Sequence, residues 1–155
     1  MDNSVSGISL ETEEISQYLE ITHPFLMIDR VTDLVPGERA QSVKKLAVDD
    51  WFFDCHLKRA EAMPGTLQIE AMLQTLVLTI YTIEDHAGKF SYITDIKTKL
   101  FSKVSPGDQL EISAELKSFS RGIAKGIAIG KVNEKTVCRG EFTFISPHFL
   151  PHVHG

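Results

Sequence analysis

One long apolar helix, in a chain without a second helix to cover it, most constrains the fold. Apolar residues at helical spacing, Leu67 and Leu76 among them, fill residues 65 to about 83 and leave few polar positions. A helix that is apolar on nearly every side is buried on nearly every side. Pro64 suits the first position of this helix, and Gly88 suits a stop after it.

The remaining sequence favours strands on both sides of this helix. Residues 24–48 form two strand-like halves separated by the turn signal Pro36-Gly37, which predicts a hairpin. Downstream of the helix, four further segments are strand-like, and short turns join the last three: residues 90–104, 109–120, 122–132 and 136–145. A short helix is expected within residues 9–21, and residues 49–65 are expected to be irregular.

The sheet must wrap the long helix, because no second helix of comparable length is available to cover it. This arrangement predicts an α+β class and the hotdog fold, in which one long central helix is wrapped by an antiparallel β-sheet. The length of 155 residues suits one domain with a sizeable core. We therefore expect residues 1–155 to form a single domain, with flexible tails over about residues 1–8 and 147–155.

Charge and composition exclude several classes of protein. The net charge of −5 and the pI of about 5.6 argue against a general nucleic-acid binder. Two cysteines, Cys55 and Cys138, are too few for a disulfide framework or a cysteine-based zinc site. The acidic N-terminal sequence has no visible secretory signal, and the most apolar run, residues 76–83, is too short for membrane insertion. A cytoplasmic location is therefore expected.

Two narrow polar stripes run along the predicted helix: Gln68, Thr75, Thr79 and Thr82 on one side, and Thr66, Glu70 and Gln74 on the other. One interpretation is that one stripe faces solvent and the other is tolerated. That interpretation suits threonine and glutamine better than Glu70, because an unpaired carboxylate on a sheet-wrapped helix is costly. Carboxylates with a shifted pKa gather at functional sites, which makes Glu70 a candidate catalytic residue.

The start of the helix offers two further candidates. The first turn of a helix has unpaired N–H groups at the positive end of its dipole, and these groups can polarise a carbonyl. Gly65 has no side chain to obstruct a ligand there, although a Pro-Gly pair also simply begins many helices. His56 lies just upstream, where a neutral imidazole suits proton removal. With Glu70 as the acid, this set fits removal of a proton beside a thioester and loss of a β-hydroxyl.

The residues around these candidates resemble the FabZ-type β-hydroxyacyl-acyl-carrier-protein dehydratases. The family pattern F-F-x-G-H-F-P-x-x-P-x-M-P-G-x-L-x-x-E-A-x-x-Q aligns without a gap with FFDCHLKRAEAMPGTLQIEAMLQ, residues 52–74. Shorter stretches are also similar to the family: HPFLMIDRV, VPGERA, SPGDQLEISAEL and SRGIAKGIAIGKV. The similarity extends from about Ile15 to Ile145.

The resemblance implies a role for each matching residue. His56 would take the α-proton and Glu70 would protonate the departing hydroxyl, while the Gly65 amide polarises the thioester carbonyl. The implied substrate-binding residues are Met63, Pro64, Gly65 and Gln74, of which Gln74 also helps to orient Glu70. The substrate would be a (3R)-hydroxyacyl chain on the phosphopantetheine of an acyl carrier protein, the product a trans-2-enoyl chain, and no metal or organic cofactor is implied. The family forms homodimers with His and Glu facing each other across the interface, and hexamers built as trimers of dimers are usual.

The sequence departs from the family pattern next to His56. Cys55 replaces the glycine before the histidine, and both prolines of the following loop, residues 57–61, are absent. Missing prolines leave the loop more conformational freedom to lose on ordering. Lys58 and Arg59 in this loop either favour an acidic carrier protein, which would suit a specialised polyketide-like pathway, or are ordinary solvated charges.

Two other functions compete with dehydration. A hotdog thioesterase would use Glu70 to activate water, although the Met-Pro-Gly match weighs against it. A subunit that binds acyl chains or carrier proteins without catalysis is suggested by the loop changes and opposed by the retained His56 and Glu70. Of the other residues, Cys55 is expected in the core, and His86 is expected to be a favourable charge at the helix end. The histidines of the C-terminal tail are expected to bind no metal, and acyl chain length does not follow from these motifs.

Overall fold

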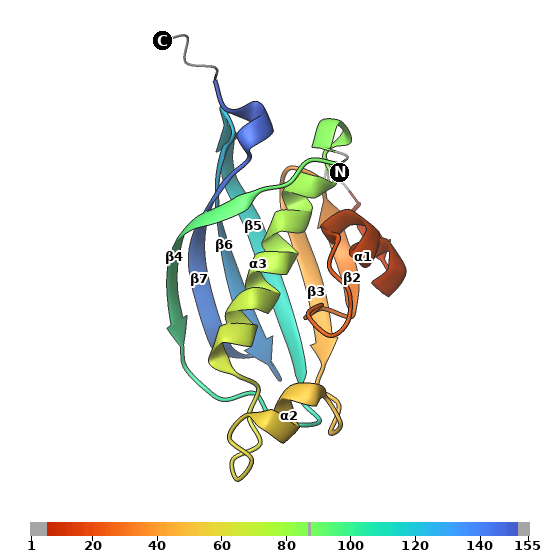
Figure 1. Cartoon of the computed structure of the whole chain (residues 1–155), viewed down its shortest axis with the longest axis vertical. Coiled ribbons are helices and arrows are strands. Elements are labelled where there is room, and N and C mark those ends of the chain that lie inside the picture. Colours follow the sequence, from red (N-terminus) through yellow and green to blue (C-terminus); the bar gives the residue numbers. More distant parts are fainter. Residues whose placement is uncertain (1–5, 87, 152–155) are drawn as a thin grey trace, which may run out of the picture.

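The computed structural model describes residues 6–86 and 88–151, and within them one sheet has the strand order β1-β2-β3-β5-β6-β7-β4. Every neighbouring pair of strands is antiparallel. The strands are β1 Ile8–Leu10, β2 Arg30–Val35, β3 Arg39–Lys45, β4 Tyr92–Leu100, β5 Gln109–Ser120, β6 Ile123–Val132 and β7 Lys135–Ile145. Figure 1 shows the long helix α3, Gly65–Tyr81, crossing one face of this sheet. The predicted α+β hotdog arrangement is confirmed.

Three of the smaller helices lie close to the ends of the chain or to the C-terminal end of α3. The helix α1, Thr12–Leu19, lies beside α3 and buries Ile15 and Leu19. The single-turn helices are η1 Glu84–His86 and η2 Pro147–Phe149. No helix among the described residues combines the length and the apolar character needed to cross a membrane.

A fourth small helix, α2, Trp51–Cys55, occupies part of residues 49–65, where the sequence predicted irregular structure. That prediction is wrong for these five residues. The reason is tertiary, because Phe52 and Phe53 are both buried in the core and their rings pack edge to face with centroids 4.8 Å apart.

The strand β4 lies at the edge of the sheet beside β7, not beside β5, which follows it in sequence. The chain therefore leaves α3, runs along the far edge and returns through residues 101–108 to the middle of the sheet. On this return Val104 accepts a hydrogen bond of 2.8 Å from the Met63 amide, just before α3 begins. Along β4 every residue except Thr98 is exposed. β4 is therefore the most exposed strand of the described sheet.

The middle of α3 is buried on both polar stripes, so the interpretation that one stripe faces solvent is wrong. On one side Gln68, Thr75 and Thr79 are buried, and on the other side Gln74 is buried. The threonine hydroxyls donate to carbonyls of their own helix, at 2.8 Å from Thr75 to Ala71 and 2.6 Å from Thr79 to Leu76. The two threonine hydroxyls are compatible with burial because the helix itself satisfies them, whereas Gln68 Oε1 has no hydrogen-bond partner among the described residues.

The ends of α3 differ slightly from the prediction. Pro64 is the capping residue before the helix, and Gly65 is its first residue. The helix stops at Tyr81 and not near residue 83, because the Ile83 amide bonds to the Ile80 carbonyl three residues back, at 3.1 Å, and the chain then tightens into η1.

The two expected tails lie partly outside the described residues, as do His152 and His154. Of the N-terminal tail predicted over about residues 1–8, the structure describes residues 6–8, and β1 begins at Ile8. Of the C-terminal tail predicted over residues 147–155, it describes residues 147–151, which include η2.

Candidate active site

The short helix α2 fixes the position of His56. A five-residue helix has little stability of its own, so tertiary contacts must hold it. Beside the buried Phe52 and Phe53, Trp51 Nε1 donates a hydrogen bond of 3.0 Å to the Pro24 carbonyl. His56 follows α2 directly with extended backbone, and its ring is partly exposed.

The ring of His56 is oriented by one hydrogen bond. Its Nδ1 lies 3.1 Å from the carbonyl oxygen of Ala62. A carbonyl can only accept, so Nδ1 carries the proton in this pair and Nε2 of the neutral ring keeps its lone pair. The Nε2 lone pair can therefore accept a proton from a substrate. The Ala62 carbonyl has no sequence signature, because any residue could supply it.

The loop after His56 is braced without the prolines that the family pattern contains. Leu57 and Glu61 adopt left-handed backbone conformations, with φ of 44° and 42°. The Leu57 carbonyl accepts from the Ala60 amide at 2.7 Å and from the Glu61 amide at 3.1 Å, which closes a tight turn. Lys103 Nζ also donates to the Ala60 carbonyl at 2.8 Å. Hydrogen bonds therefore replace proline rings in restraining residues 57–61.

The start of α3 presents unpaired backbone donors next to this loop. Met63 is buried and its amide bonds to Val104, which anchors the chain just before Pro64. The amides of Gly65 and Thr66 donate no hydrogen bond to the described residues, as expected for the first turn of a helix. These donors sit at the positive end of the helix dipole and suit a developing negative charge on oxygen.

Leu100, at the end of β4, lies over Gly65. A Cβ placed on Gly65 would lie 2.5 Å from Leu100 Cδ1, which is closer than van der Waals contact allows. Leu100 is half exposed, so the tip of its side chain can move. Glycine is required here for close approach, and the covering residue belongs to a strand 35 positions later in the sequence.

Glu70 lies one and a half turns into α3 and is held by Gln74. Gln74 Nε2 donates 3.1 Å to Glu70 Oε1 and 3.0 Å to the Phe25 carbonyl, and Gln74 Oε1 accepts from the Met27 amide at 2.8 Å. Both amide hydrogens of Gln74 are thus committed to protein acceptors. Gln74 orients Glu70, and it ties α3 to residues 25–27, a contact that sequence patterns do not reveal.

The environment of Glu70 favours its protonated form. Burial raises the pKa of the Glu70 carboxyl above its usual range, and the hydrogen bond from Gln74 opposes part of that rise. A carboxyl that holds its proton closer to neutral pH can act as a general acid.

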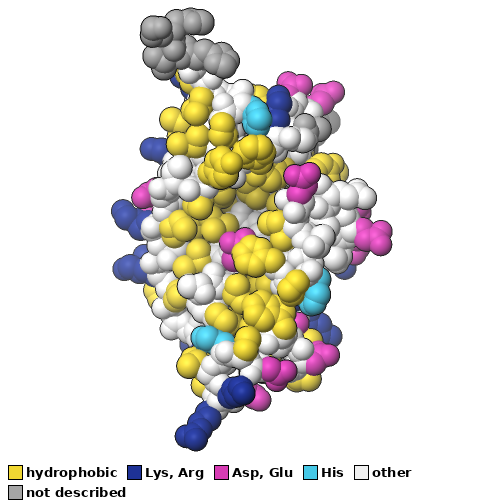
Figure 2. Space-filling view, viewed as in Figure 1, with side chains coloured by type: hydrophobic (Ala, Val, Ile, Leu, Met, Phe, Trp, Pro, Cys, Tyr) yellow, Lys and Arg dark blue, Asp and Glu magenta, His cyan; other side chains and the backbone are white. Residues whose placement is uncertain are grey.

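A shallow apolar groove of about 160 Å³ starts at Glu70. It is lined by Leu19, Ile21, Glu70, Leu73, Gln74, Val77, Tyr81, Ser91, Ile93 and Phe144. Figure 2 shows hydrophobic side chains gathered over this face of the molecule, on which α3 and β4 lie. An apolar groove beside a single acid can hold a hydrocarbon chain with its reactive carbons near the acid.

The predicted site residues fall into two groups within one chain. Met63, Pro64 and Gly65 lie beside the loop that carries His56, whereas Gln74 contacts Glu70. No hydrogen bond among the described residues joins His56 to Glu70. Within one chain, each half of the candidate site is held by its own hydrogen bonds, and α3 carries residues of both halves.

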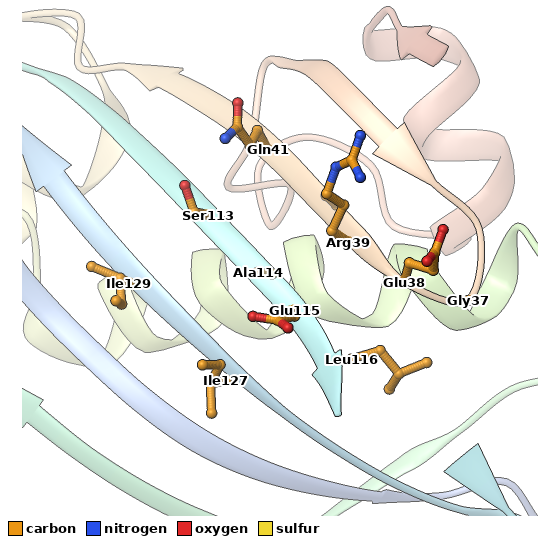
Figure 3. A pocket seen from close by; sticks show the side chains of 11 residues that line it. Gly37, Glu38, Arg39, Gln41, Ser113, Ala114, Glu115, Leu116, Ile127 and Ile129 are labelled. Carbon is orange, nitrogen blue, oxygen red and sulfur yellow. The ribbon is translucent and has the colours of Figure 1, made fainter. Parts of the chain in front are cut away.

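A wider hollow of about 380 Å³ lies on the opposite face of the sheet. Figure 3 shows its side chains, including Gln41, Ser113, Glu115, Ile127 and Ile129, standing on β3, β5 and β6 with α3 on the far side. None of the predicted site residues lines this hollow.

The remaining chemical candidates do not add to the site. Cys55 is exposed, so the expectation of a core residue is wrong. Phe52 and Phe53 fill the core at α2, and Cys55 Sγ lies against the backbone carbonyls of Trp51 and Phe52. Cys138 is buried, and burial raises the pKa of its thiol to about 11. Among the described residues, no three His, Cys, Asp or Glu side chains are grouped so as to hold a metal ion.

Comparison with known proteins places this architecture in a family. A family model described as a FabA-like domain matches residues 20–141. The chain belongs to this FabA-like family. A 3-hydroxyacyl-[acyl-carrier-protein] dehydratase FabZ from Syntrophomonas wolfei is 40% identical over 138 residues, which cover 88% of this chain and 96% of that protein. The corresponding protein from Macrococcus caseolyticus is 35% identical, with 87% and 94% covered.

Solved structures support the fold of this FabA-like chain. The dehydratase heterocomplex ApeI:P from Xenorhabdus doucetiae superposes with a TM-score of 0.71 at 13% identity, covering 86% of this chain and 90% of that chain. Cj0977, a sigma28-regulated virulence protein from Campylobacter jejuni, gives 0.68 at 14% identity, with 89% and 98% covered. At such low identity these structures show the shared fold alone.

Proposed function

We propose that this protein dehydrates 3-hydroxyacyl chains carried on an acyl carrier protein, as in fatty-acid biosynthesis, with His56 as base and Glu70 as acid. The observation that carries the proposal is Glu70, a carboxyl with a raised pKa, held by Gln74 at the start of an apolar groove. The names of the FabA-like relatives described above support the same reaction and substrate class.

The proposed reaction moves two protons and breaks one C–O bond. His56 Nε2 removes the proton from C2 of the thioester, while the Gly65 amide hydrogen-bonds the carbonyl oxygen as negative charge builds on it. The bond between C3 and the hydroxyl oxygen then breaks, and the Glu70 carboxyl gives its proton to that oxygen, which leaves as water. The electron pair of the former C2–H bond forms the C2=C3 double bond. Proton exchange with solvent resets His56 and Glu70.

The substrate-binding residues of this proposal are Met63, Pro64, Gly65 and Gln74. Pro64 and Gly65 would contact the thioester at the start of α3. Met63 and Gln74 are buried, so they support the site by fixing the helix start and Glu70, respectively. The steps use only groups of the chain and of the substrate, and the phosphopantetheine belongs to the carrier. The absence of a metal or organic cofactor stays a prediction, and so does a cytoplasmic location.

The complete site would use two chains. His56 of one protomer would act with Glu70 of the partner subunit, in keeping with the family pattern, and no hydrogen bond among the described residues joins these two side chains within one chain. The edge strand β4 supports this arrangement. It exposes the large side chains of Tyr92, Ile93, Ile96 and Leu100 beside the charged Asp95, Lys97 and Lys99. A long edge strand also presents unpaired N–H and C=O groups with which a second chain can pair. A homodimer is the smallest assembly that the proposal requires, and a hexamer of three dimers stays a prediction.

The carrier protein would dock on the loop after His56. Lys58 and Arg59 are exposed on a turn that Lys103 holds in place, next to the helix start where the thioester must lie. In a chain of net charge −5, this loop is a local cationic surface. Cations at the mouth of the site would attract an acidic carrier.

A direct assay tests the reaction. The protein is incubated with a 3-hydroxyacyl thioester, and the enoyl absorbance and free thiol are followed. We expect enoyl product, and a loss of about 10²- to 10⁴-fold in both His56→Ala and Glu70→Gln. Release of free thiol would indicate a thioesterase instead. Formation of neither product would indicate a binding subunit. Full activity in both variants would show that His56 and Glu70 are not the catalytic pair.

Mixing the two variants tests the two-chain site. When His56→Ala and Glu70→Gln chains are unfolded and refolded together, random pairing gives half mixed dimers, each with one complete site. The mixture should therefore regain roughly a quarter of the wild-type activity. A site built within one chain would regain none.

A further inference from the structure

The groove beside Glu70 follows one face of α3 towards its C-terminal end. Glu70, Leu73, Val77 and Tyr81 line it at positions i, i+3, i+7 and i+11. This spacing keeps the side chains on one stripe of the helix. At 1.5 Å per residue, the stripe extends roughly 16 Å from Glu70 to Tyr81. Glu70 thus marks one end of the groove, and Tyr81 marks the other.

Tyr81 is fixed in place by hydrogen bonds to the residue before β4. Its hydroxyl accepts from the Ser91 amide at 2.7 Å and lies 3.5 Å from the Ser91 carbonyl oxygen. The Ser91 hydroxyl in turn lies 2.6 Å from the hydroxyl of Ser146, which is buried. The tyrosine ring is therefore held across the space between the end of α3 and the start of β4. It cannot swing aside without breaking these bonds.

Tyr81 also lines a second cavity, of about 380 Å³. The character of this cavity differs from that of the groove. Its other lining residues include Glu14, Gln17, Glu20 and Lys89, whereas Leu73 and Val77 line the groove. Tyr81 therefore lines both the apolar groove that contains Glu70 and a cavity that contains charged side chains.

We propose that Tyr81 is the partition that sets the longest acyl chain the site accepts. The inference rests on the proposed dehydratase function and adds the residue that limits its substrate. Each methylene group placed along Leu73 and Val77 improves binding about fourfold by leaving water. The gain ends at the Tyr81 ring, because a longer chain must displace the anchored ring and enter the polar cavity. Chains that end before Tyr81 are unaffected by it.

The test is a chain-length series of 3-hydroxyacyl carrier thioesters with wild type, Tyr81→Ala and Tyr81→Phe. Shortening the side chain joins the two cavities. For the shortest chain whose kcat/KM falls tenfold below the wild-type optimum, we expect Tyr81→Ala to recover about tenfold, mainly through a lower KM, because remote methylenes bind substrate and transition state alike. Short-chain activity should stay within about twofold. Tyr81→Phe keeps the ring but loses its anchor and should shift the limit by a smaller amount in the same direction.

Matched variants at Tyr18 provide the control. Tyr18 is exposed on α1 and lines the second cavity but not the groove. Tyr18→Ala and Tyr18→Phe therefore alter the second cavity while Tyr81 stays in place, and they should leave the length profile unchanged. An unchanged profile in Tyr81→Ala, or equal losses at all lengths, would overturn the proposal. If Tyr81→Ala does not fold, Tyr81→Phe decides, and an unchanged limit in that variant overturns the proposal.

Failure of the proposed function would look different. If wild type forms no enoyl product at any chain length, dehydration is wrong, and the partition is then tested by binding alone. Calorimetry with saturated acyl thioesters of increasing length would measure the same limit. A limit that moves to longer chains in Tyr81→Ala supports the partition, and an identical limit in both proteins overturns it.

Discussion

The two ends of α3 differ in whether their polar groups have hydrogen-bond partners within the protein. At the N-terminal end, the Gly65 and Thr66 amides are left without partners among the described residues, and the adjoining loop exposes Lys58 and Arg59. At the C-terminal end, the Tyr81 hydroxyl is bonded to Ser91. The N-terminal end therefore leaves backbone N–H groups available to a ligand. The C-terminal end uses its polar side chain in hydrogen bonds within the protein.

Aromatic rings also pack together just after the C-terminal end of α3. The ring of His86 stacks on Phe149, with centroids 4.3 Å apart, and lies 5.2 Å from Phe119. In the proposed site, one buried helix provides both the place where the thioester binds and the residue that limits the acyl chain, with Glu70 between them. Changes at the first end should alter activity, and changes at the second should alter stability or substrate length.

Among changes at the two ends of α3, the largest effect is expected from Gly65→Ala, which tests whether the thioester binds at the N-terminal end. The added methyl would push against Leu100 and stand beside the unpaired amide, so a thioester carbonyl could not approach it. We expect kcat/KM on a short thioester to fall about a hundredfold, with little change in thermal unfolding. Thr66→Ala, exposed at the next position, should retain activity. Normal turnover in Gly65→Ala would exclude a role for the Gly65 amide.

A smaller effect is expected from reversing the charges of the loop, with Lys58→Glu and Arg59→Glu combined. An acidic carrier should bind about tenfold more weakly, while a short free thioester is turned over normally. The difference should shrink at high salt, because exposed charges are screened. The matched control is Lys131→Glu with Lys135→Glu, which removes the same charge elsewhere on the sheet. Equal losses on both substrates would show that the loop does not dock the carrier.

The burial of His86, just after the C-terminal end of α3, predicts that the free energy of unfolding depends on pH. The expectation of a favourable charge at the helix end is wrong, because His86 is buried and neither ring nitrogen has a partner among the described residues. Burial, and secondarily the charge of Lys89, lower the pKa of His86, and Asp85 opposes this. The unfolded chain therefore binds a proton more readily, and the stability that this group contributes is complete above its ordinary pKa of 6.5 and is lost as pH falls through the lower folded value.

His86→Phe measures this effect. Removing the unpaired nitrogens should raise the free energy of unfolding by about 1 kcal/mol at pH 8, and the gain should grow towards pH 5. Urea unfolding at both pH values measures the difference. His148→Phe, at an exposed histidine, is the control. A gain that is equal at both pH values would mean that His86 does not titrate between them.

The smallest effect is expected between the two ends, in the stability of Glu70→Gln. The raised pKa of Glu70 means that its contribution is complete below the ordinary pKa of 4.5 and is lost as pH rises through the folded value. Glutamine avoids the burial of a carboxylate, so the variant should melt about 2 °C higher than wild type at pH 8 and equally at pH 4. Glu141→Gln, at an exposed position, should show neither change. A lower melting temperature at pH 8 would contradict the burial argument.

Prediction from sequence succeeded where neighbouring residues decide the structure. The α3 helix was predictable because the spacing of its apolar residues fits a helix and not a strand. The hydrogen bond between Glu70 and Gln74 follows from their i, i+4 positions on that helix. The predictions for Cys55 and His86 failed, because whether such a side chain is buried depends on which distant elements pack against it. Phe149 lies 63 residues after His86 in the sequence, and no local pattern connects them.

The sequence by itself determined a buried helix with a Pro-Gly start, a carboxyl on one of its stripes and a histidine upstream, since these depend on bond geometry and local spacing. The tertiary structure alone decided three further features. It put β4 at an open edge, laid Leu100 over Gly65, and anchored Tyr81 across the groove. Each joins segments that are distant in sequence, and such contacts are fixed by how the whole chain buries its apolar surface.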